Sequence, residues 1–166
     1  MAAGRVSTSR HRRQPLAVEI VDRQRALAVP HRWLTRVCRW ALEAEGVVEA
    51  GITLLLVDDA GIGTLHDRWL GDPRPTDVIT FDLGAGDGSV IQGDIACSAE
   101  TAVREAAHYG WPARCELAYY AIHGVLHLTG YDDRRGNDRR AMRAREREVF
   151  AAIGLPVPPR LRRRRP

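Results

Sequence analysis

The sequence of 166 residues contains no lysine, so all 25 of its basic residues are arginine. It also has no apolar run near the ~20 residues that a membrane-spanning helix needs. The longest candidate is ITLLLV, at residues 52–57. The first residues include no hydrophobic stretch of the kind found in secretory signals. We therefore expect a protein without a membrane segment, located in the cytoplasm.

Cysteine is scarce as well. The three cysteines, Cys38, Cys97 and Cys115, are widely spaced and form no C-x-x-C pair. An odd number of scattered cysteines is typical of a protein from a reducing compartment, where disulfides are rare. This pattern again indicates the cytosol.

Acidic residues are absent from both ends of the chain. Residues 1–14 contain four arginines and residues 156–166 contain five, which leaves 16 arginines and all 21 acidic residues in the segment between them. We expect a basic disordered tail at 1–14, one domain at 15–155 and a Pro/Arg-rich basic tail at 156–166. The run RLRRRRP fits either a phosphate-binding arm or a solvated end, and the sequence leaves both open.

Between these ends, hydrophobic periodicity and turn residues predict an α/β (α+β) domain. The expected order is β-α-β-α-β-β-α-α-α, with a small mixed sheet of about four strands packed with about five helices. The strands are expected at 15–23, 51–59, 77–83 and 90–98. The helices are expected at 30–46, 60–71, 98–110, 111–130 and 133–153.

The long apolar helix at 111–130 ends in HGVLHLTGYDD, which has the spacing of a metal site. His123 and His127 lie about 40° apart on one helix face and about 6 Å apart along the axis. Gly130 can end the helix and turn the chain back, so that Asp133 reaches the same ion, although Asp132 is an alternative. These spacings match the H-E-x-x-H-x-x-G-x-x-H zinc pattern, and we therefore predict a zincin-like metal helix. The competing interpretation is a chance pair of histidines on an amphipathic helix.

The residue after the first histidine limits which reactions the site can catalyse. Metallopeptidases with this spacing carry a glutamate there as general base, whereas this chain has Gly124. Hydrolysis of a phosphodiester depends more on a metal-activated water and on charge neutralisation, with arginines as phosphate clamps. Asp132 could orient a ligand or help to deprotonate water. Phosphodiester hydrolysis is therefore favoured over peptide cleavage.

HGVLHLTGYDD closely resembles the signature H-G-x-L-H-L-x-G-Y-D-H of the YbeY family, which are bacterial metal-dependent endoribonucleases and ribosomal RNA maturation factors. PTDVITF, at residues 75–81, resembles the P-T-[DN]-V-L-S-F block of that family. GDIACS, at residues 93–98, with REA at 104–106, resembles its G-D-I-x-I-x stretch. The three blocks agree in order and spacing, and the resemblance covers about residues 16–153.

The resemblance implies an α/β fold with one Zn²⁺ per chain, held by His123, His127 and Asp133, the last in place of the usual third histidine. A carboxylate binds zinc at similar distances, so we interpret the site as a working variant. The implied function is a single-strand-acting endoribonuclease in ribosomal RNA (16S 3′ end) maturation and ribosome quality control. The implied partners are RNA and the ribosomal subunit.

One position departs from the family pattern. Leu70 stands where many members carry an arginine that contacts RNA phosphate, and Arg68 or Arg74 could substitute for it. Arg139 and Arg143 share one face of the last helix and are further candidates for phosphate contacts, although solvated Arg–Glu pairs such as Arg143 with Glu146 explain part of this pattern. Two alternatives remain: a metallopeptidase, and a non-catalytic ribosome-assembly factor with a structural metal.

Overall fold

The computed structural model of the chain describes residues 16–84 and 90–162. The order of its elements is the one that the sequence predicts. They are β1 (Leu16–Asp22), α1 (His31–Ala44), β2 (Ala50–Val57), α2 (Asp59–Leu70), β3 (Val78–Asp82), β4 (Ile91–Ser98), α3 (Ala99–Tyr109), α4 (Ala113–Leu128), α5 (Gly136–Ala152) and the short 3₁₀ helix η1 (Pro159–Leu161).

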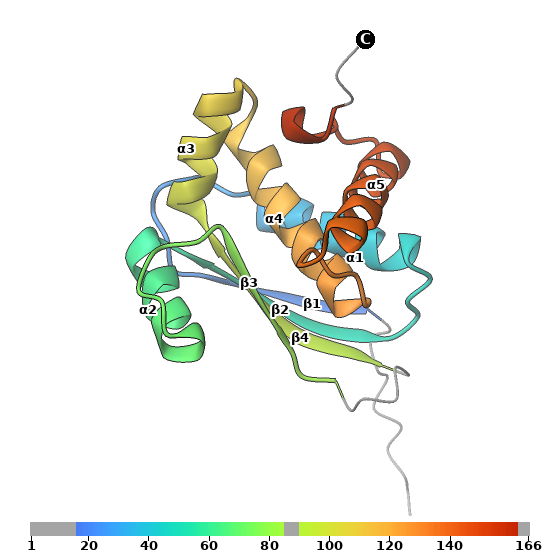
Figure 1. The fold of residues 1–166 in the computed structure, drawn as a ribbon, viewed down its shortest axis with the longest axis horizontal. Helices are drawn as coiled ribbons and strands as arrows, with labels where there is room; N and C mark the ends of the chain where they lie inside the picture. The colour runs from blue at the N-terminus through green and yellow to red at the C-terminus, as the bar shows by residue number, and fades with distance from the viewer. Residues whose placement is uncertain (1–15, 85–89, 163–166) are drawn as a thin grey trace, which may run out of the picture.

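The four strands form one mixed sheet in the order β1-β2-β4-β3. β1 and β4 are parallel to β2, whereas β3 pairs with β4 in the antiparallel sense and lies at the edge. α1 and α4 pack on one face of the sheet, α3 and α5 flank α4, and α2 packs on the other face (Figure 1). The predicted α/β fold with a mixed four-stranded sheet and five helices is confirmed.

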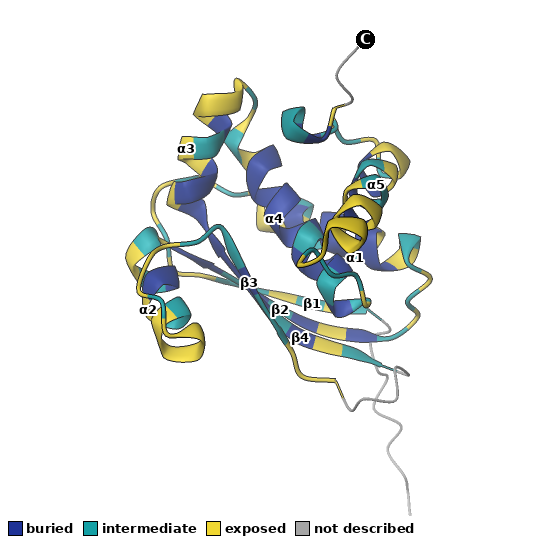
Figure 2. Cartoon of the chain, in the orientation of Figure 1, coloured by how far each residue is buried: buried dark blue, intermediate teal, exposed yellow. Residues whose placement is uncertain are grey.

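α4 is the central helix of the core. Every residue of α4 from Cys115 to Leu128 is buried, apart from His123 and His127, which are half-buried. Figure 2 shows this helix in the buried colour along most of its length, between the sheet and the outer helices. A helix that is apolar on all sides needs such surroundings. After the first two residues of α4, the two histidines are therefore the places where this helix reaches solvent.

Short polar side chains and glycines set the ends of α2 and α3. Asp58 accepts a hydrogen bond from the Gly61 N–H at the start of α2, and Ser98 accepts one from the Thr101 N–H at the start of α3. Gly71 and Gly110 end these two helices in the left-handed conformation that glycine adopts at low cost. Asp58 and Ser98 therefore act as the N-caps of α2 and α3.

The close contact between α4 and β4 depends on Gly124. A Cβ atom at this position would lie 2.6 Å from Cγ2 of Ile95, whose side chain is fully buried on β4. Position 124 therefore faces the sheet and not the solvent-exposed side of α4. A glutamate there would be wedged between helix and sheet, so the fold itself excludes the general base of the peptidase pattern.

Replacing Gly124 by alanine is expected to lower the free energy of unfolding by about 1–3 kcal/mol, because overpacking forces the helix off the sheet and outweighs the gain in helix propensity. The matched control is Gly136→Ala at the start of α5, where an added Cβ meets nothing within 4 Å. That variant is expected to be neutral or slightly stabilising. Urea denaturation of both variants measures the difference, and equal midpoints would contradict the packing role of Gly124.

The chain after α5 returns to the core. We call residues 155–162 the C-terminal segment; Leu155 and Val157 pack against the core and Leu161 is buried within it. The sequence analysis had assigned a basic tail from residue 156. Of that tail, the part up to 162 is described and lies against the domain, whereas residues 163–166, like residues 1–14, are outside the described residues. None of the helices in the described ranges is long and apolar enough to cross a membrane.

Candidate metal centre

The C-terminal end of α4 brings three predicted residues together. His123 and His127 lie one turn apart, on the side of α4 that is not packed on β4. After Thr129 the chain turns at Gly130, whose φ is 102°, and the Tyr131 N–H donates to the Leu126 carbonyl at 3.0 Å. This turn places the Asp133 carboxylate next to both imidazoles. We call these three side chains the His–His–Asp group.

The separations within the His–His–Asp group suit a single metal ion. Nε2 of His123 and Nε2 of His127 lie 3.0 Å apart. The carboxylate oxygens of Asp133 lie 3.7 Å from the former and 3.9 Å from the latter. Two atoms that are each about 2.1 Å from one ion can be at most about 4.2 Å apart, and each of these separations falls below this limit, with Oδ2 of Asp133 near His123 and Oδ1 near His127. The group is therefore compact enough to share one ion.

Hydrogen bonds on the other ring nitrogens make both Nε2 atoms available as ligands. Nδ1 of His123 lies 2.7 Å from the Glu146 carboxylate, and Nδ1 of His127 lies 3.0 Å from the carbonyl oxygen of Tyr131. Because both partners can only accept, each Nδ1 carries the hydrogen in the neutral ring. Two lone pairs then face each other across 3.0 Å, and a shared cation relieves their repulsion.

The electrostatics of His127 favour the form that binds metal. Burial lowers the pKa of His127, and the neighbouring His123 lowers it further. Loss of the proton leaves the neutral imidazole, which is the ligand form. The donor set of two nitrogens and one carboxylate oxygen is one that Zn²⁺ accepts.

Glu146 is the important residue that the sequence analysis assigned wrongly. It was expected in a solvated pair with Arg143, but its side chain is 1% exposed and bonds to His123, with the Tyr119 hydroxyl donating to its second oxygen at 3.3 Å. The signal was present in the spacing, because Glu146 lies four residues after Met142 and four before Phe150, both on the inward face of α5. An exposed Arg–Glu pair of the expected kind does occur on the same helix, between Arg145 and Glu148 at 2.9 Å.

Asp132 points to a different partner from Asp133. Its carboxylate accepts from the backbone N–H of Arg134 at 3.1 Å and from the guanidinium of that residue at 2.9 Å. These bonds lower the pKa of Asp132. Asp132 borders the cavity beside the metal group but is not among the three side chains that share it. A direct role of Asp132 in proton transfer stays a prediction.

Two open cavities meet at the His–His–Asp group. The first, of about 680 Å³, lies between α2, β3 and the end of α4. The second, of about 630 Å³, lies between the start of β3, α4, α5 and the C-terminal segment. Both are lined by His123, His127 and Asp133, together with Thr76, Val78 and Arg134. An extended substrate can therefore reach the His–His–Asp group from two sides.

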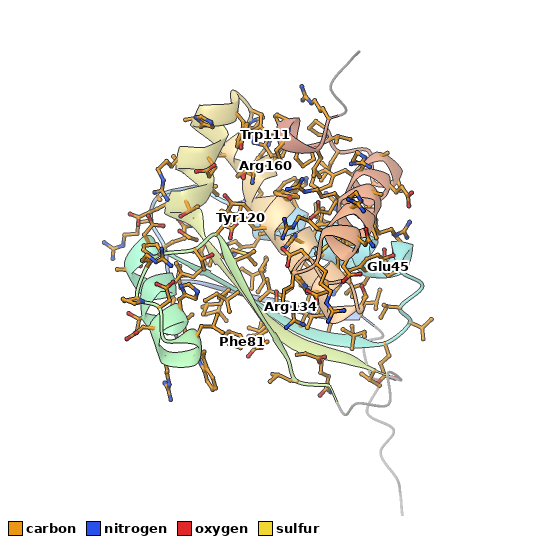
Figure 3. All side chains as sticks on the ribbon, viewed as in Figure 1. Glu45, Phe81, Trp111, Tyr120, Arg134 and Arg160 are labelled. Atoms are coloured by element: carbon orange, nitrogen blue, oxygen red, sulfur yellow. The ribbon has the colours of Figure 1, made fainter. Side chains whose placement is uncertain are left out.

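The four predicted phosphate contacts divide into two pairs. Arg139 and Arg143 line the second cavity, and Arg139 also donates to the Asp133 carbonyl at 2.9 Å. Neither cavity is lined by Arg68 or Arg74: the guanidinium of Arg68 lies over its neighbour Trp69, and that of Arg74 is paired with Asp72. Leu70 lines the first cavity. Arg134 and Arg160 also line the second cavity (Figure 3). Arg160 is the first residue of the run RLRRRRP, for which the sequence left a phosphate-binding arm and a solvated end both open.

Comparisons of this sequence with known proteins point to one family. The sequence model of the family described as "Endoribonuclease YbeY" matches residues 19–154. The Endoribonuclease YbeY of Pelotomaculum thermopropionicum is 41% identical over 129 residues, which cover 74% of this chain and 85% of that protein. That of Geobacter sulfurreducens is 37% identical over 144 residues, which cover 83% of this chain and 96% of that protein.

The fold has a counterpart among solved structures. The solution structure of TM1509 from Thermotoga maritima matches with a TM-score of 0.57 at 23% sequence identity, over 82% of this chain and 91% of that one. This likeness supports the arrangement of the mixed sheet and its helices.

Proposed function

The chain belongs to the YbeY family, and we propose that it is a metal-dependent endoribonuclease whose active site is the His–His–Asp group. One observation carries the site assignment. In an otherwise buried helix, two half-buried imidazoles turn their Nε2 lone pairs toward each other and toward a carboxylate, where two cavities meet. Such a site combines affinity for a cation with access for a substrate.

We propose Zn²⁺ as the ion, one per chain, with His123, His127 and Asp133 as its ligands. When bound with three protein ligands, zinc lowers the pKa of a water molecule and neutralises charge on a phosphate. The chain supplies the orientation: Glu146 and the Tyr131 carbonyl fix the two imidazole rings. Arg139 and Arg143 line the second cavity and would hold the flanking phosphates through charge-assisted hydrogen bonds.

The substrate that we propose is single-stranded ribosomal RNA, cleaved near the 3′ end of 16S RNA during maturation and quality control, with the ribosomal subunit as partner. The signature in HGVLHLTGYDD and the shared blocks support this assignment. A cytoplasmic location is consistent with the three cysteines, which are free and buried.

The two alternatives fit the geometry less well. A metallopeptidase needs a general base after the first histidine, and position 124 is packed against Ile95 without room for one. A purely structural zinc site is usually closed by four protein ligands. Here the side chains of His127 and Asp133 are 26% and 44% exposed and border two open cavities.

Removal of the metal is expected to abolish RNA cleavage. The full-length chain, loaded with zinc, is incubated with a single-stranded oligoribonucleotide that carries a fluorophore and a quencher, with and without EDTA. We expect cleavage that EDTA stops and that added zinc restores, because the proposed reaction uses a water activated by the bound ion, and Nδ1 of both histidines is already hydrogen-bonded. A panel of unstructured peptides is the parallel substrate. Release of peptide fragments, or RNA cleavage that EDTA leaves unchanged, would contradict the proposal.

A further inference from the structure

The second cavity follows α4 away from the His–His–Asp group toward the start of that helix. Arg134, after the end of α4, lines it at one end, and Arg160, which is paired with Glu116 in the first turn of α4, lines it at the other (Figure 3). On α4 the cavity is lined from Tyr119 to His127, eight positions apart, which corresponds to about 12 Å at 1.5 Å per residue. The cavity therefore extends beyond the metal group and has room for more than one phosphate of an extended strand.

One residue of the C-terminal segment, Arg160, lines the far end of this cavity. Leu161 is 3% exposed in the core, and η1 fixes the backbone on either side of Arg160. These residues lie beyond position 154, where the match to the family model ends. Arg160 is therefore a feature of this chain that the family resemblance does not cover.

The Arg160 guanidinium is held in place from several sides. It forms an ion pair with Glu116, which is fully buried and also accepts from the Trp111 indole N–H at 2.7 Å. It lies over the rings of Tyr109 and Tyr119, at 4.6 and 5.0 Å from their centroids. Its Nε is buried and has no hydrogen-bond partner among the described residues. An arginine fixed in this way loses little side-chain entropy when it binds an anion.

Arginines outnumber carboxylates around the second cavity by four to three, and two of these arginines, Arg134 and Arg160, are themselves paired with Asp132 and Glu116. Four arginines line it: Arg134, Arg139, Arg143 and Arg160. Its acidic residues already have partners. Glu146 bonds to His123, Asp133 belongs to the His–His–Asp group, and Asp77 accepts from the Val78 N–H. The first cavity differs, since Arg134 is its one arginine and three aspartates line it. Phosphates are thus attracted to one side of the metal group.

From this asymmetry we propose that Arg160 binds a phosphate of the RNA strand at the end of the second cavity remote from the His–His–Asp group. The strand then runs along α4 between α5 and the start of β3, and the C-terminal segment is part of the substrate site. This inference rests on the proposed function, because it assigns RNA to the same site. Arg160 contributes to binding of the strand and not to the reacting atoms.

The test compares Arg160→Met with Arg145→Met. Arg145 is the matched control, because its side chain is 26% exposed against 23% for Arg160 and is likewise tied to a glutamate, Glu45. Glu45 lies on the side of α5 away from Tyr120 (Figure 3), and Arg145 lines neither cavity. Both variants lose one positive charge and the ion pair with a buried glutamate; Arg145→Met also loses the exposed pair with Glu148, so the control is the more heavily perturbed of the two.

Binding is measured by fluorescence anisotropy of the zinc-loaded full chain with a phosphorothioate oligoribonucleotide, whose linkages keep their charge and resist hydrolysis, at several salt concentrations. Relative to Arg145→Met, we expect Arg160→Met to weaken binding about tenfold and to reduce the slope of log K against log salt by about one. In cleavage assays KM is expected to rise with little change in kcat. The double variant Glu116→Gln/Arg160→Met leaves no buried carboxylate unpaired and is expected to show the same loss.

Equal affinity and equal salt dependence of the double variant and Arg145→Met would overturn the assignment of Arg160. The two proposals fail differently. If the wild type cleaves RNA but Arg160→Met binds it like the control, the role of Arg160 is wrong and the nuclease stands. If the wild type never cleaves RNA but Arg160→Met still weakens binding, the nuclease proposal is wrong and the phosphate site stands.

Discussion

Replacing His127 by alanine is expected to lower kcat/KM for RNA cleavage by at least about a thousandfold and to leave the purified protein without bound zinc. The imidazole is one of only three donors in the His–His–Asp group, so its loss leaves two. A metal ion contributes several kcal/mol to stabilisation of the transition state, and about 4 kcal/mol corresponds to a factor of about a thousand. The fold is expected to survive, because His127 is half-buried and its ring bonds to a backbone carbonyl of the adjacent turn.

The control for this variant is His66→Ala. His66 lines the same first cavity and also bonds through Nδ1 to a backbone carbonyl, that of Arg74, but it is not part of the metal group. Metal content by mass spectrometry and the rate of cleavage are measured together. Asp133→Asn against Asp132→Asn makes the same comparison for the carboxylate. Retention of zinc and of activity in His127→Ala, or equal losses in His66→Ala, would refute the assigned ligands.

The parts of the fold that were predictable are those in which local pattern and tertiary structure agree. Hydrophobic periodicity and turn residues predicted the strands and helices, and the caps Asp58 and Ser98 each bond within the first turn of α2 and α3. The metal residues were predictable for the same reason, since one turn of helix and one glycine turn connect His123, His127 and Asp133. Each of these features needs only contacts that are close in sequence.

The parts that were not predictable depend on contacts between distant residues. In the sequence, Arg160 is one of several arginines in a basic tail. The phosphate-binding role that we propose for Arg160 depends on its pairing with Glu116, 44 positions earlier. In the sequence, Glu146 resembles a surface glutamate of an arginine-rich helix. Its contact with His123 is evident only once α5 is placed beside α4. A charged residue at an inward position of a helix is costly to bury unless it is paired. Such residues mark sites whose partners the sequence alone does not identify.

Gly124 connects the architecture with the chemistry. The same absence of a side chain that lets α4 contact Ile95 removes the glutamate of the peptidase pattern. Besides Asp133, the acidic residue at the histidines is Glu146, whose carboxylate bonds to Nδ1 of His123. The Glu146 carboxylate lines the second cavity but bonds to His123, a proposed metal ligand. Together with Asp133 it supplies two negative charges, which match the charge of one divalent ion.

Replacing Glu146 by glutamine is therefore expected to weaken zinc binding by about 10–100-fold. The amide keeps the shape of the side chain and can still accept from Nδ1 of His123, so the ring stays in place. It loses the negative charge that strengthens this hydrogen bond and raises the basicity of Nε2. Zinc added well above its dissociation constant stabilises the wild type against heat. A hundredfold weaker affinity removes about 2.7 kcal/mol of that stabilisation.

Thermal unfolding with and without zinc, together with competition against a chelator, measures this effect independently of cleavage. The matched control is Glu148→Gln, two positions along α5, whose side chain is 63% exposed and pairs with Arg145. Tyr119→Phe removes the hydroxyl that bonds to Glu146 at 3.3 Å without touching His123, and is expected to weaken zinc binding less than Glu146→Gln does. If Glu146→Gln binds zinc as tightly as Glu148→Gln, the carboxylate serves only packing. If the zinc affinity of Tyr119→Phe instead lies between those of the wild type and Glu146→Gln, the effect acts through the contacts from Tyr119 through Glu146 to the metal-binding nitrogen of His123.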